Sequence, residues 1–299
     1  MKSEYITPSV TLFKEDGSLD LASQEKHYQR LIDAEISGIL ILGSIGEFFA
    51  LRMEQKKEMI RHAASAIKGK TQFPIGTGGM QQGELQELTA FAFENGADAA
   101  VVISPYYFTM NEDSLRKYYG AAAEAASGMP VYIYNFPDRT GYDISPALML
   151  ELARTYPNIR GVKDTIPGVA HTRDIVKTVK AEFPDFRVYS GFDDNFAYNI
   201  LSGGNGCIGG LSNVIPEFFR DFRKALEDED LGKVSTMQQT VNKLMDIYNV
   251  GVPFVPYIKA ALYALGYIGS AQSTFPLPGA SEEQIGQILS ILNYSGKNQ

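Results

Sequence analysis

Residues 159–165 read IRGVKDT, a short and mostly apolar run that predicts a buried β-strand. Successive side chains of a strand point to opposite faces, so Lys163 shares a face with Gly161 and Asp164 points to the other side. Lys163 therefore lies where a core residue is expected, near the carboxyl end of the strand. We expect Asp164 to act in a turn or at a helix start, and not as the counter-ion of Lys163.

A lysine in an apolar layer has two interpretations. Removing an ammonium group from water is costly, so burial favours the neutral amine. The neutral amine is the form that attacks a carbonyl carbon and forms a Schiff base. The alternative is a lysine at a strand end whose ammonium group reaches solvent. This run alone leaves both interpretations of Lys163 open.

Seven further β-rich runs accompany residues 159–165. They cover residues 5–13, 38–44, 73–79, 99–105, 130–137, 186–192 and 206–212. Helical runs separate them, and the strands are apolar throughout, which is typical of a parallel sheet covered on both faces. Eight such units predict an α/β fold, a (β/α)₈ TIM barrel, whose chemistry lies at the carboxyl ends of the strands.

The helical runs have recognisable ends. Runs that start near Asp20, Met53, Glu84 and Glu112 are expected to stop at Gly38, Gly69, Gly96 and Gly128, because glycine readily adopts the left-handed conformation that ends a helix. Ser145 followed by Pro146 predicts another helix start. After Ser212 the alternation ends, and three helical runs begin near Leu231, Pro253 and Ser281. We expect a catalytic barrel over residues 1–225 and a C-terminal helical extension over residues 226–299, packed on the barrel.

The composition narrows the class of protein. Of 299 residues, 44% are hydrophobic and 21% are charged, which suits a large core. The net charge of −8 argues against a nucleic-acid or anionic-membrane surface. The single cysteine excludes an internal disulfide, and no apolar run approaches the ~20 residues of a membrane span. With no signal-peptide pattern at the start, we expect a cytoplasmic protein.

The histidines give no sign of a metal site. His27, His62 and His171 lie on predicted helices or helix starts and share no spacing typical of metal ligands. We therefore expect no metal.

The turn after the second predicted strand reads GSIGEF, residues 43–48. Its backbone N–H groups and the Ser44 hydroxyl could form an anion-binding nest for a small carboxylate, with Ile45 and Gly46 in the same turn. The alternative is a tight turn with no ligand. Glu47 is expected to be structural, with hydrogen bonds to the loop.

Tyrosines and an arginine follow the fourth and fifth predicted strands. Tyr107 lies in SPYYF, residues 104–108, where paired aromatic residues suit packing, a subunit interface or the site of a neighbouring subunit. Tyr134 is near the end of its strand, where a phenol could move protons beside an imine; the alternative is a core tyrosine. Arg139 could lie on the surface or grip a substrate carboxylate.

The last two strands end in polar and glycine-rich runs. In SGFDDNF, residues 190–196, Gly191 and Asp193 are candidates for substrate binding, although one aspartate there could cap a helix. Residues 203–210, GGNGCIGG, match the dinucleotide fingerprint only formally, since they do not join a strand to a helix. We expect close barrel packing there, with Ile208 at the substrate.

Together these motifs resemble those of the dihydrodipicolinate synthase / N-acetylneuraminate lyase family of class I, pyruvate-handling aldolases. The resemblance rests on GSIGE, SPYY, YNFPxRTG, GVKDT and SGFDD, in family order from about Ile6 to Ala264. It implies that Lys163 forms a Schiff base with the C2 carbonyl of a 2-keto acid, and that Tyr134 is the acid and base. It also implies a carboxylate nest at Ser44 and Ile45, and no cofactor beyond the covalent imine. Tyr107 matches a residue lent by a neighbouring subunit, which implies a homotetramer built as a dimer of dimers.

Departures from the family pattern bear on the substrate. The synthase branch has two threonines where this chain has Ser44 and Ile45, yet Arg139 matches the synthase residue that holds the second carboxylate. The sialic-acid branch has an Asp-Glu pair and a later serine where this chain has Asp193, Asp194 and Gly210, so N-acetylneuraminate lyase ranks third. LGSIGEF, GTGG, GVKDT and GFDD are most similar to bacterial 2-keto-3-deoxy-sugar-acid aldolases.

The leading hypothesis is therefore a lyase that cleaves a 2-keto-3-deoxy sugar acid to pyruvate and an aldehyde. The enzymic alternatives are dihydrodipicolinate synthase, which condenses pyruvate with aspartate semialdehyde, and a dehydratase that uses the same imine. A ligand-binding barrel without turnover is the non-enzymic alternative. A phosphate-binding isomerase barrel is disfavoured because residues 203–213 contain no lysine or arginine.

Overall fold

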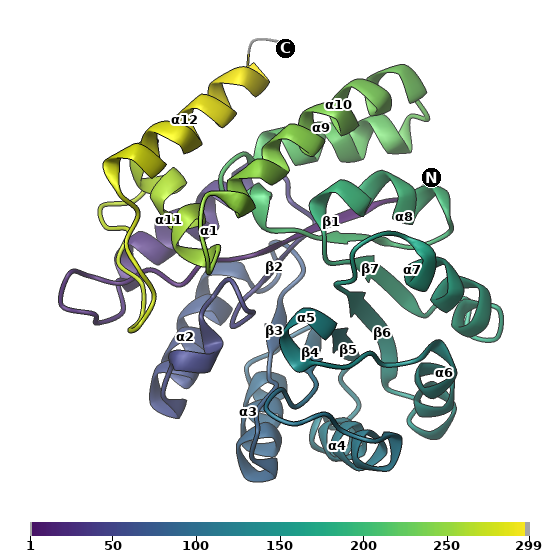
Figure 1. Ribbon diagram of the computed structural model, residues 1–299. Coiled ribbons are helices and arrows are strands. Elements are labelled where there is room, and N and C mark those ends of the chain that lie inside the picture. The colour runs from purple at the N-terminus through teal and green to yellow at the C-terminus, as the bar shows by residue number, and fades with distance from the viewer. Residues whose placement is uncertain (1, 297–299) are drawn as a thin grey trace.

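Eight parallel strands form a barrel in the computed structural model, which describes residues 2–296 (Figure 1). The strands are β1 (Glu4–Pro8), β2 (Gly38–Leu40), β3 (Pro74–Gly76), β4 (Ala99–Ile103), β5 (Val131–Asn135), β6 (Ile159–Asp164), β7 (Arg187–Ser190) and β8 (Gly206–Ile208). They pair in the order β2-β1-β8-β7-β6-β5-β4-β3. Parallel bridges Gly38↔Gln72 and Ile41↔Ile75 join the second and third strand segments. The predicted TIM barrel is confirmed.

Helices lie between the strands and after them. They are α1 (Leu21–Asp33), α2 (Met53–Ile67), α3 (Gln82–Glu94), α4 (Glu112–Ala125), α5 (Pro137–Thr140), α6 (Pro146–Thr155), α7 (Ala170–Ile175), α8 (Phe196–Leu201), α9 (Pro216–Glu227), α10 (Leu231–Leu244), α11 (Val255–Ala264) and α12 (Glu282–Gly296). Asp20 caps α1 by accepting a hydrogen bond from the Ser23 amide, and Ser145 caps α6 in the same way from Leu148. Gly69, Gly96 and Gly128 have φ of 78°, 79° and 89°, as expected of helix stops.

Two helix predictions are wrong. The helix that starts after Asp20 ends at Asp33, because Glu35 already adopts the left-handed conformation (φ 57°) that ends it. Gly38 instead opens β2, where an added Cβ would lie 2.9 Å from Gln72 Cβ. The alternation also continues beyond Ser212, since α9 follows β8 and begins with Pro216 at its first turn.

The glycine-rich run before and within β8 packs closely, as predicted. Gly206 has φ of 150°, and a Cβ there would lie 1.8 Å from the carbonyl oxygen of Glu4. A side chain at this position would therefore push β8 away from β1 and open the barrel.

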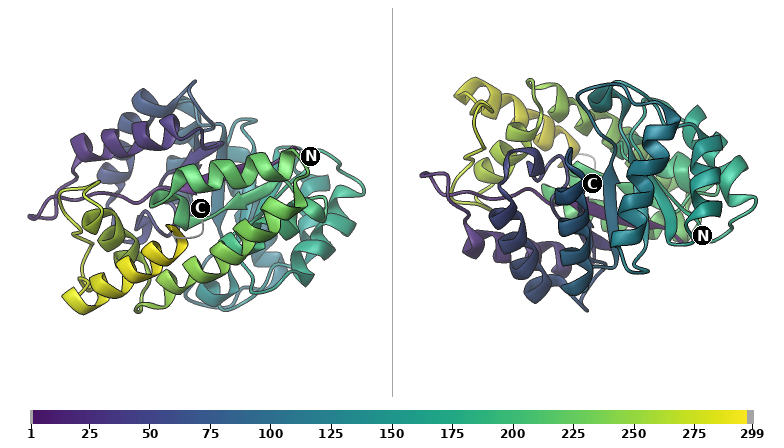
Figure 2. Two further views of the ribbon diagram at one scale, coloured as in Figure 1. Left: turned by 90° about the horizontal axis from the view of Figure 1, so that it is seen from above. Right: turned by 90° about the horizontal axis from the view of Figure 1, so that it is seen from below.

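The extension shares a core with one side of the barrel. Apolar residues of β1, α8 and α9 form a continuous buried cluster with residues of α10, α11 and α12, among them Tyr5, Phe219, Val241, Leu262 and Ile288. Figures 1 and 2 show these last helices gathered on one side of the barrel. Packing of the helical run on the barrel is thus observed, whereas the division at residues 225 and 226 stays a prediction.

A buried ion pair also ties the extension to the barrel. Lys259 of α11 pairs with Glu47, which follows the turn after β2, and both side chains are fully buried. Lys259 also donates to the Gln272 carbonyl (2.9 Å), and Glu47 accepts from the Thr274 amide and hydroxyl (2.7 Å each). Burial lowers the pKa of Lys259, while the facing carboxylate opposes this shift. Glu47 is therefore structural, as predicted.

We expect Lys259→Met to lower the free energy of unfolding by about 3–5 kcal/mol, because it leaves the Glu47 charge buried without its partner. The double variant Glu47→Gln, Lys259→Met should recover most of this loss, since neither charge remains. Thermal unfolding at fixed protein concentration measures both effects. An unchanged midpoint for Lys259→Met would show that the pair does not hold the extension.

Candidate active site

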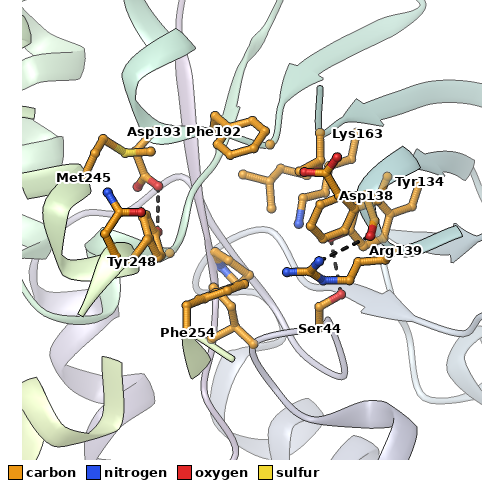
Figure 3. Close-up of a pocket in the computed structure, with 18 residues that line it drawn as sticks. Ser44, Tyr134, Asp138, Arg139, Lys163, Phe192, Asp193, Met245, Tyr248 and Phe254 are labelled. Atoms are coloured by element: carbon orange, nitrogen blue, oxygen red, sulfur yellow. Dashed lines mark hydrogen bonds between the residues drawn. The ribbon is translucent and has the colours of Figure 1, made fainter. Parts of the chain in front are cut away.

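A cavity of about 220 Å³ opens at the carboxyl ends of the strands (Figure 3). Its lining brings together most of the predicted site residues: Ser44, Ile45, Tyr134, Arg139, Lys163, Gly191, Asp193 and Ile208. Gly46 and Tyr107 lie outside the lining of this cavity. The remaining wall comes from loops of the barrel and from the C-terminal extension.

Lys163 and Tyr134 face each other inside the barrel. They are direct partners in the parallel register of β5 and β6, and the Lys163 Nζ lies 4.2 Å from the centre of the Tyr134 ring. The two residues are each 4% exposed, so the interpretation of Lys163 as a lysine that reaches solvent is wrong. No ion pair joins Lys163 to a carboxylate within residues 2–296. The ring face of Tyr134 is therefore the observed partner of the amine.

The hydroxyl groups of Ser44 and Tyr134 form a polar link beside this amine. They lie 3.3 Å apart, and either can donate the hydrogen bond. Ser44 comes from the turn after β2, and Tyr134 stacks on Phe136 at 5.8 Å between ring centroids. The phenol is thus held in place and connected to a second hydroxyl, which is the arrangement that proton transfer needs.

The turn after β2 has the geometry of an anion-binding nest. The Glu47 amide donates to the Ser44 carbonyl (3.1 Å), and Glu47 itself is left-handed at φ 56°. Gly46 is fixed by a hydrogen bond that its carbonyl accepts from the Thr11 hydroxyl at 2.7 Å. The amides of Ser44, Ile45 and Gly46 donate no hydrogen bond to the residues that the structure describes. Successive amides of this kind can bind a carboxylate.

Arg139 and Thr165 lie further along the cavity wall. The Arg139 guanidinium lies 5.2 Å from the Phe136 ring centre and donates to the Asp138 carbonyl at 3.3 Å. Thr165 is 4% exposed, and its hydroxyl has no hydrogen-bond partner among residues 2–296. Sequence reasoning missed Thr165, although it follows Lys163 by two residues and so continues the same face of the chain.

The Asp193 carboxylate is engaged by groups of the protein. One oxygen accepts from the Tyr5 hydroxyl and from the Leu211 amide (3.0 Å), and the other accepts from the Tyr248 hydroxyl at 2.7 Å. Burial raises the pKa of Asp193, and these hydrogen bonds oppose the shift. Asp193 therefore joins the barrel to the extension at the cavity wall.

The extension supplies a wall that the sequence did not reveal. Met245, Tyr248, Asn249 and Phe254 line the cavity. Figure 3 shows Met245 and Tyr248 across the cavity from Tyr134 and Arg139. The four residues of the extension lie in and after the short helical turn Met245–Asn249. No motif marks them, because their place depends on how the extension packs.

Tyr107 does not line this cavity. It is 78% exposed and packs edge-to-face on the exposed Phe108, with 4.8 Å between ring centroids. Its role at a neighbouring subunit stays a prediction.

Within the described part of the chain, no three or more His, Cys, Asp or Glu side chains are grouped to hold a metal ion, and no helix could cross a membrane. The histidines lie on α1, α2 and α7, as predicted. Burial lowers the pKa of His27 to about 4, despite a hydrogen bond with Asn213. His27 is therefore neutral at physiological pH.

Known proteins share both the sequence and the fold. The chain is 39% identical over 276 residues to Escherichia coli YagE, named as a 2-dehydro-3-deoxy-D-gluconate aldolase. This alignment covers 92% of this chain and 90% of YagE. The chain is 33% identical over 294 residues to E. coli YjhH, named as a 2-dehydro-3-deoxy-D-pentonate aldolase, covering 98% and 97% of the two chains. The crystal structure of YagE in complex with pyruvate superposes with a TM-score of 0.95 at 36% identity over 98% of each chain.

The family profile of the dihydrodipicolinate synthetases matches residues 1–294, almost the whole chain. With this match, the chain belongs to the dihydrodipicolinate synthetase family.

Proposed function

We propose that this protein is a class I aldolase that reversibly cleaves a 2-keto-3-deoxy sugar acid into pyruvate and an aldehyde. The observation that carries the proposal is the buried amine of Lys163, 4.2 Å from the centre of the Tyr134 ring and beside the Ser44–Tyr134 hydroxyl pair. The names of YagE and YjhH, and the pyruvate bound to YagE, support this substrate class.

The first half of the reaction forms the imine. The neutral Lys163 amine adds to the C2 carbonyl of the substrate, and Tyr134 gives its proton to the resulting hydroxyl, which leaves as water. The product is a protonated imine, and Tyr134 is left as the phenolate. The amides of Ser44 and Ile45 hold the C1 carboxylate during these steps.

The second half breaks the carbon–carbon bond. The Tyr134 phenolate takes the proton of the C4 hydroxyl, and the electrons of the C3–C4 bond move toward the imine nitrogen. An aldehyde leaves, and the pyruvate enamine remains on Lys163. A proton from solvent then adds to C3, and water hydrolyses the imine, which releases pyruvate and restores the amine. No cofactor beyond the lysine imine takes part.

The aldehyde half of the substrate would lie against Arg139, Thr165 and the extension. The unpartnered Thr165 hydroxyl and the Arg139 guanidinium offer hydrogen bonds to hydroxyl groups. Gly191 supports this wall, since a Cβ there would lie 1.8 Å from the Thr165 hydroxyl oxygen. Ile208 covers the pyruvate end with apolar surface.

We also propose that the protein works in the cytoplasm as a homotetramer. The exposed side chains of Tyr107 and Phe108 support a subunit contact on that face, because large aromatic residues are favoured in interfaces. Tyr107 would then complete the proton path of the neighbouring subunit.

Borohydride reduction in the presence of pyruvate tests the imine directly. We expect one reduced pyruvyl adduct, mapped by peptide mass analysis to Lys163, and none on folded Lys163→Ala. Lys56, which is largely buried outside the cavity, is the internal control and should remain unmodified. A folded wild-type protein without the adduct would refute the Schiff-base mechanism and favour a binding barrel without turnover.

We expect Tyr134→Phe to lower kcat for cleavage by about a hundredfold to ten-thousandfold, because it removes the group that moves protons at both steps. Ser44→Ala should have a smaller effect, since Ser44 only partners the phenol. Steady-state release of pyruvate from 2-keto-3-deoxygluconate measures both. An equal loss of kcat in the two variants would contradict this prediction, because it would assign the acid and base role to the Ser44 and Tyr134 hydroxyls together.

The identity of the product separates an aldolase from a synthase. The synthase remains the second candidate because Arg139, which could hold a second carboxylate, lines the cavity. With pyruvate and glyceraldehyde we expect a linear hydroxy-keto acid. With aspartate semialdehyde we expect little product, whereas a synthase would give a cyclic amino acid. Chromatography with mass detection identifies each product, and a faster reaction with aspartate semialdehyde would reverse the assignment.

A further inference from the structure

His171 of α7 lies between two carboxylates that come from different parts of the chain. Its Nδ1 is 3.0 Å from an Asp164 oxygen, and its Nε2 is 3.2 Å from an Asp143 oxygen. Asp164 is the last residue of β6 and is fully buried, while the Asp143 side chain is 46% exposed. The imidazole thus bridges the end of β6 and the loop after α5.

Both carboxylates belong to a larger network directly behind the cavity. The Asn135 amide nitrogen donates to Asp143 (2.7 Å) and to Asp164 (3.0 Å), and the Asn135 oxygen accepts from the Ile144 amide at 3.2 Å. Thr172 donates to the second oxygen of Asp164 at 2.7 Å. Asn135 and Asp164 are the neighbours of Tyr134 and Lys163 in the chain.

The segment that this network holds carries a wall of the cavity. Residues 136–144 connect β5 to the Asp143 loop and include Phe136, Asp138 and Arg139, all of which line the cavity. His171 itself does not line it. A change at His171 can therefore reach the substrate only by moving the segment or the strand that it holds.

We propose that His171 is a positioning residue that fixes the Arg139 segment, residues 136–144, against the Lys163 strand and so sets the affinity for the aldehyde half of the substrate. This inference rests on the proposed aldolase function.

The charges around His171 set its protonation. Burial lowers the pKa of His171, but Asp164, Asp143 and the Ile144 backbone together outweigh burial, so the pKa is raised above the ordinary histidine value. Asp174 on α7 itself also interacts electrostatically with His171, and Asp174 pairs with Arg173. As the imidazolium, His171 donates a hydrogen bond to Asp164 through Nδ1 and forms an ion pair with Asp143 through Nε2.

Stabilisation by protonated His171 is lost as the pH rises. A group whose pKa is raised on folding contributes its full stabilisation at low pH and loses it as the pH rises through the raised value. Above that value the ring is neutral, so the Nδ1 hydrogen bond to Asp164 can persist while the ion pair with Asp143 is lost. We expect KM for the sugar acid to rise with pH above the ordinary histidine range of about 6.5.

Two variants of similar size separate the hydrogen bond to Asp164 from the ion pair with Asp143. His171→Asn can keep a donor at the Nδ1 position toward Asp164 and removes the donor toward Asp143. His171→Gln can place a donor near the Nε2 position and weakens the bond to Asp164. Asp174→Asn changes a half-exposed carboxylate on the same helix and serves as the matched control.

Kinetics of 2-keto-3-deoxygluconate cleavage between about pH 6 and pH 9 test the proposal. For His171→Asn we expect KM at low pH to rise about threefold to tenfold with kcat nearly unchanged, and the His171-dependent rise of KM with pH to disappear. His171→Gln should retain a lower KM than His171→Asn. Asp174→Asn should match the wild type in KM at low pH, since Asp174 makes no hydrogen bond or ion pair with His171.

Borohydride trapping of pyruvate on the same variants separates this inference from the proposed function. We expect trapping on Lys163 to be unchanged in His171→Asn, because in the proposed site the pyruvate half is held by Lys163 and the Ser44 turn. Wild-type KM at every pH in both His171 variants would overturn the positioning role, even with trapping intact. Equal loss of trapping, kcat and thermal stability would overturn it in favour of general structural support. Absence of trapping in the wild type would instead refute the aldolase function.

Discussion

The site depends on one constraint, the parallel register that places Tyr134 directly beside Lys163. Neighbouring residues in a parallel ladder point to the same side of the sheet, so both side chains must enter the barrel together. An amine in that interior loses most of its water, and the ring face of Tyr134 offers partial compensation. Under the proposed mechanism, the barrel thereby places the nucleophile beside the proton donor.

The same register builds a second layer on the opposite side of the strands. One residue further along, Asn135 pairs with Asp164, and alternation turns both side chains outward. There they bind each other and anchor α7 through Thr172 and His171. The inner layer carries the groups that we propose to be reactive, and the outer layer fixes the strand ends that present them. Asp164 is therefore a scaffold residue, in agreement with its expected orientation away from Lys163.

The sequence predicts those parts of the site that follow from local strand pattern and barrel topology, and misses those that depend on packing between distant segments. Lys163, Tyr134 and the turn around Ser44 lie at strand ends, and strand alternation with barrel topology suffices to bring them together. The wall formed by Met245, Tyr248, Asn249 and Phe254 could not be predicted, because it depends on packing of the extension. Helix α9 was missed despite the proline in its first turn, because the alternation was expected to end at Ser212. The end of α1 was missed because Glu35, and not a glycine, adopts the left-handed conformation.

Two contacts make the extension part of the cavity. Lys259 holds Glu47, the residue that ends the nest turn, and Tyr248 holds Asp193 at the opposite wall. Because both Asp193 oxygens accept hydrogen bonds from protein groups, Asp193 has little capacity left to bind a substrate hydroxyl. The polar groups left for the aldehyde half are then Arg139, Asp138, Thr165 and Asn249, set among the apolar Met245 and Phe254. Under the proposed reaction this wall suits a short chain of hydroxyl groups, since hydroxyls can both donate to Asp138 and accept from Arg139. A second carboxylate could use only the donors, and it would face the Asp138 charge across the same small cavity.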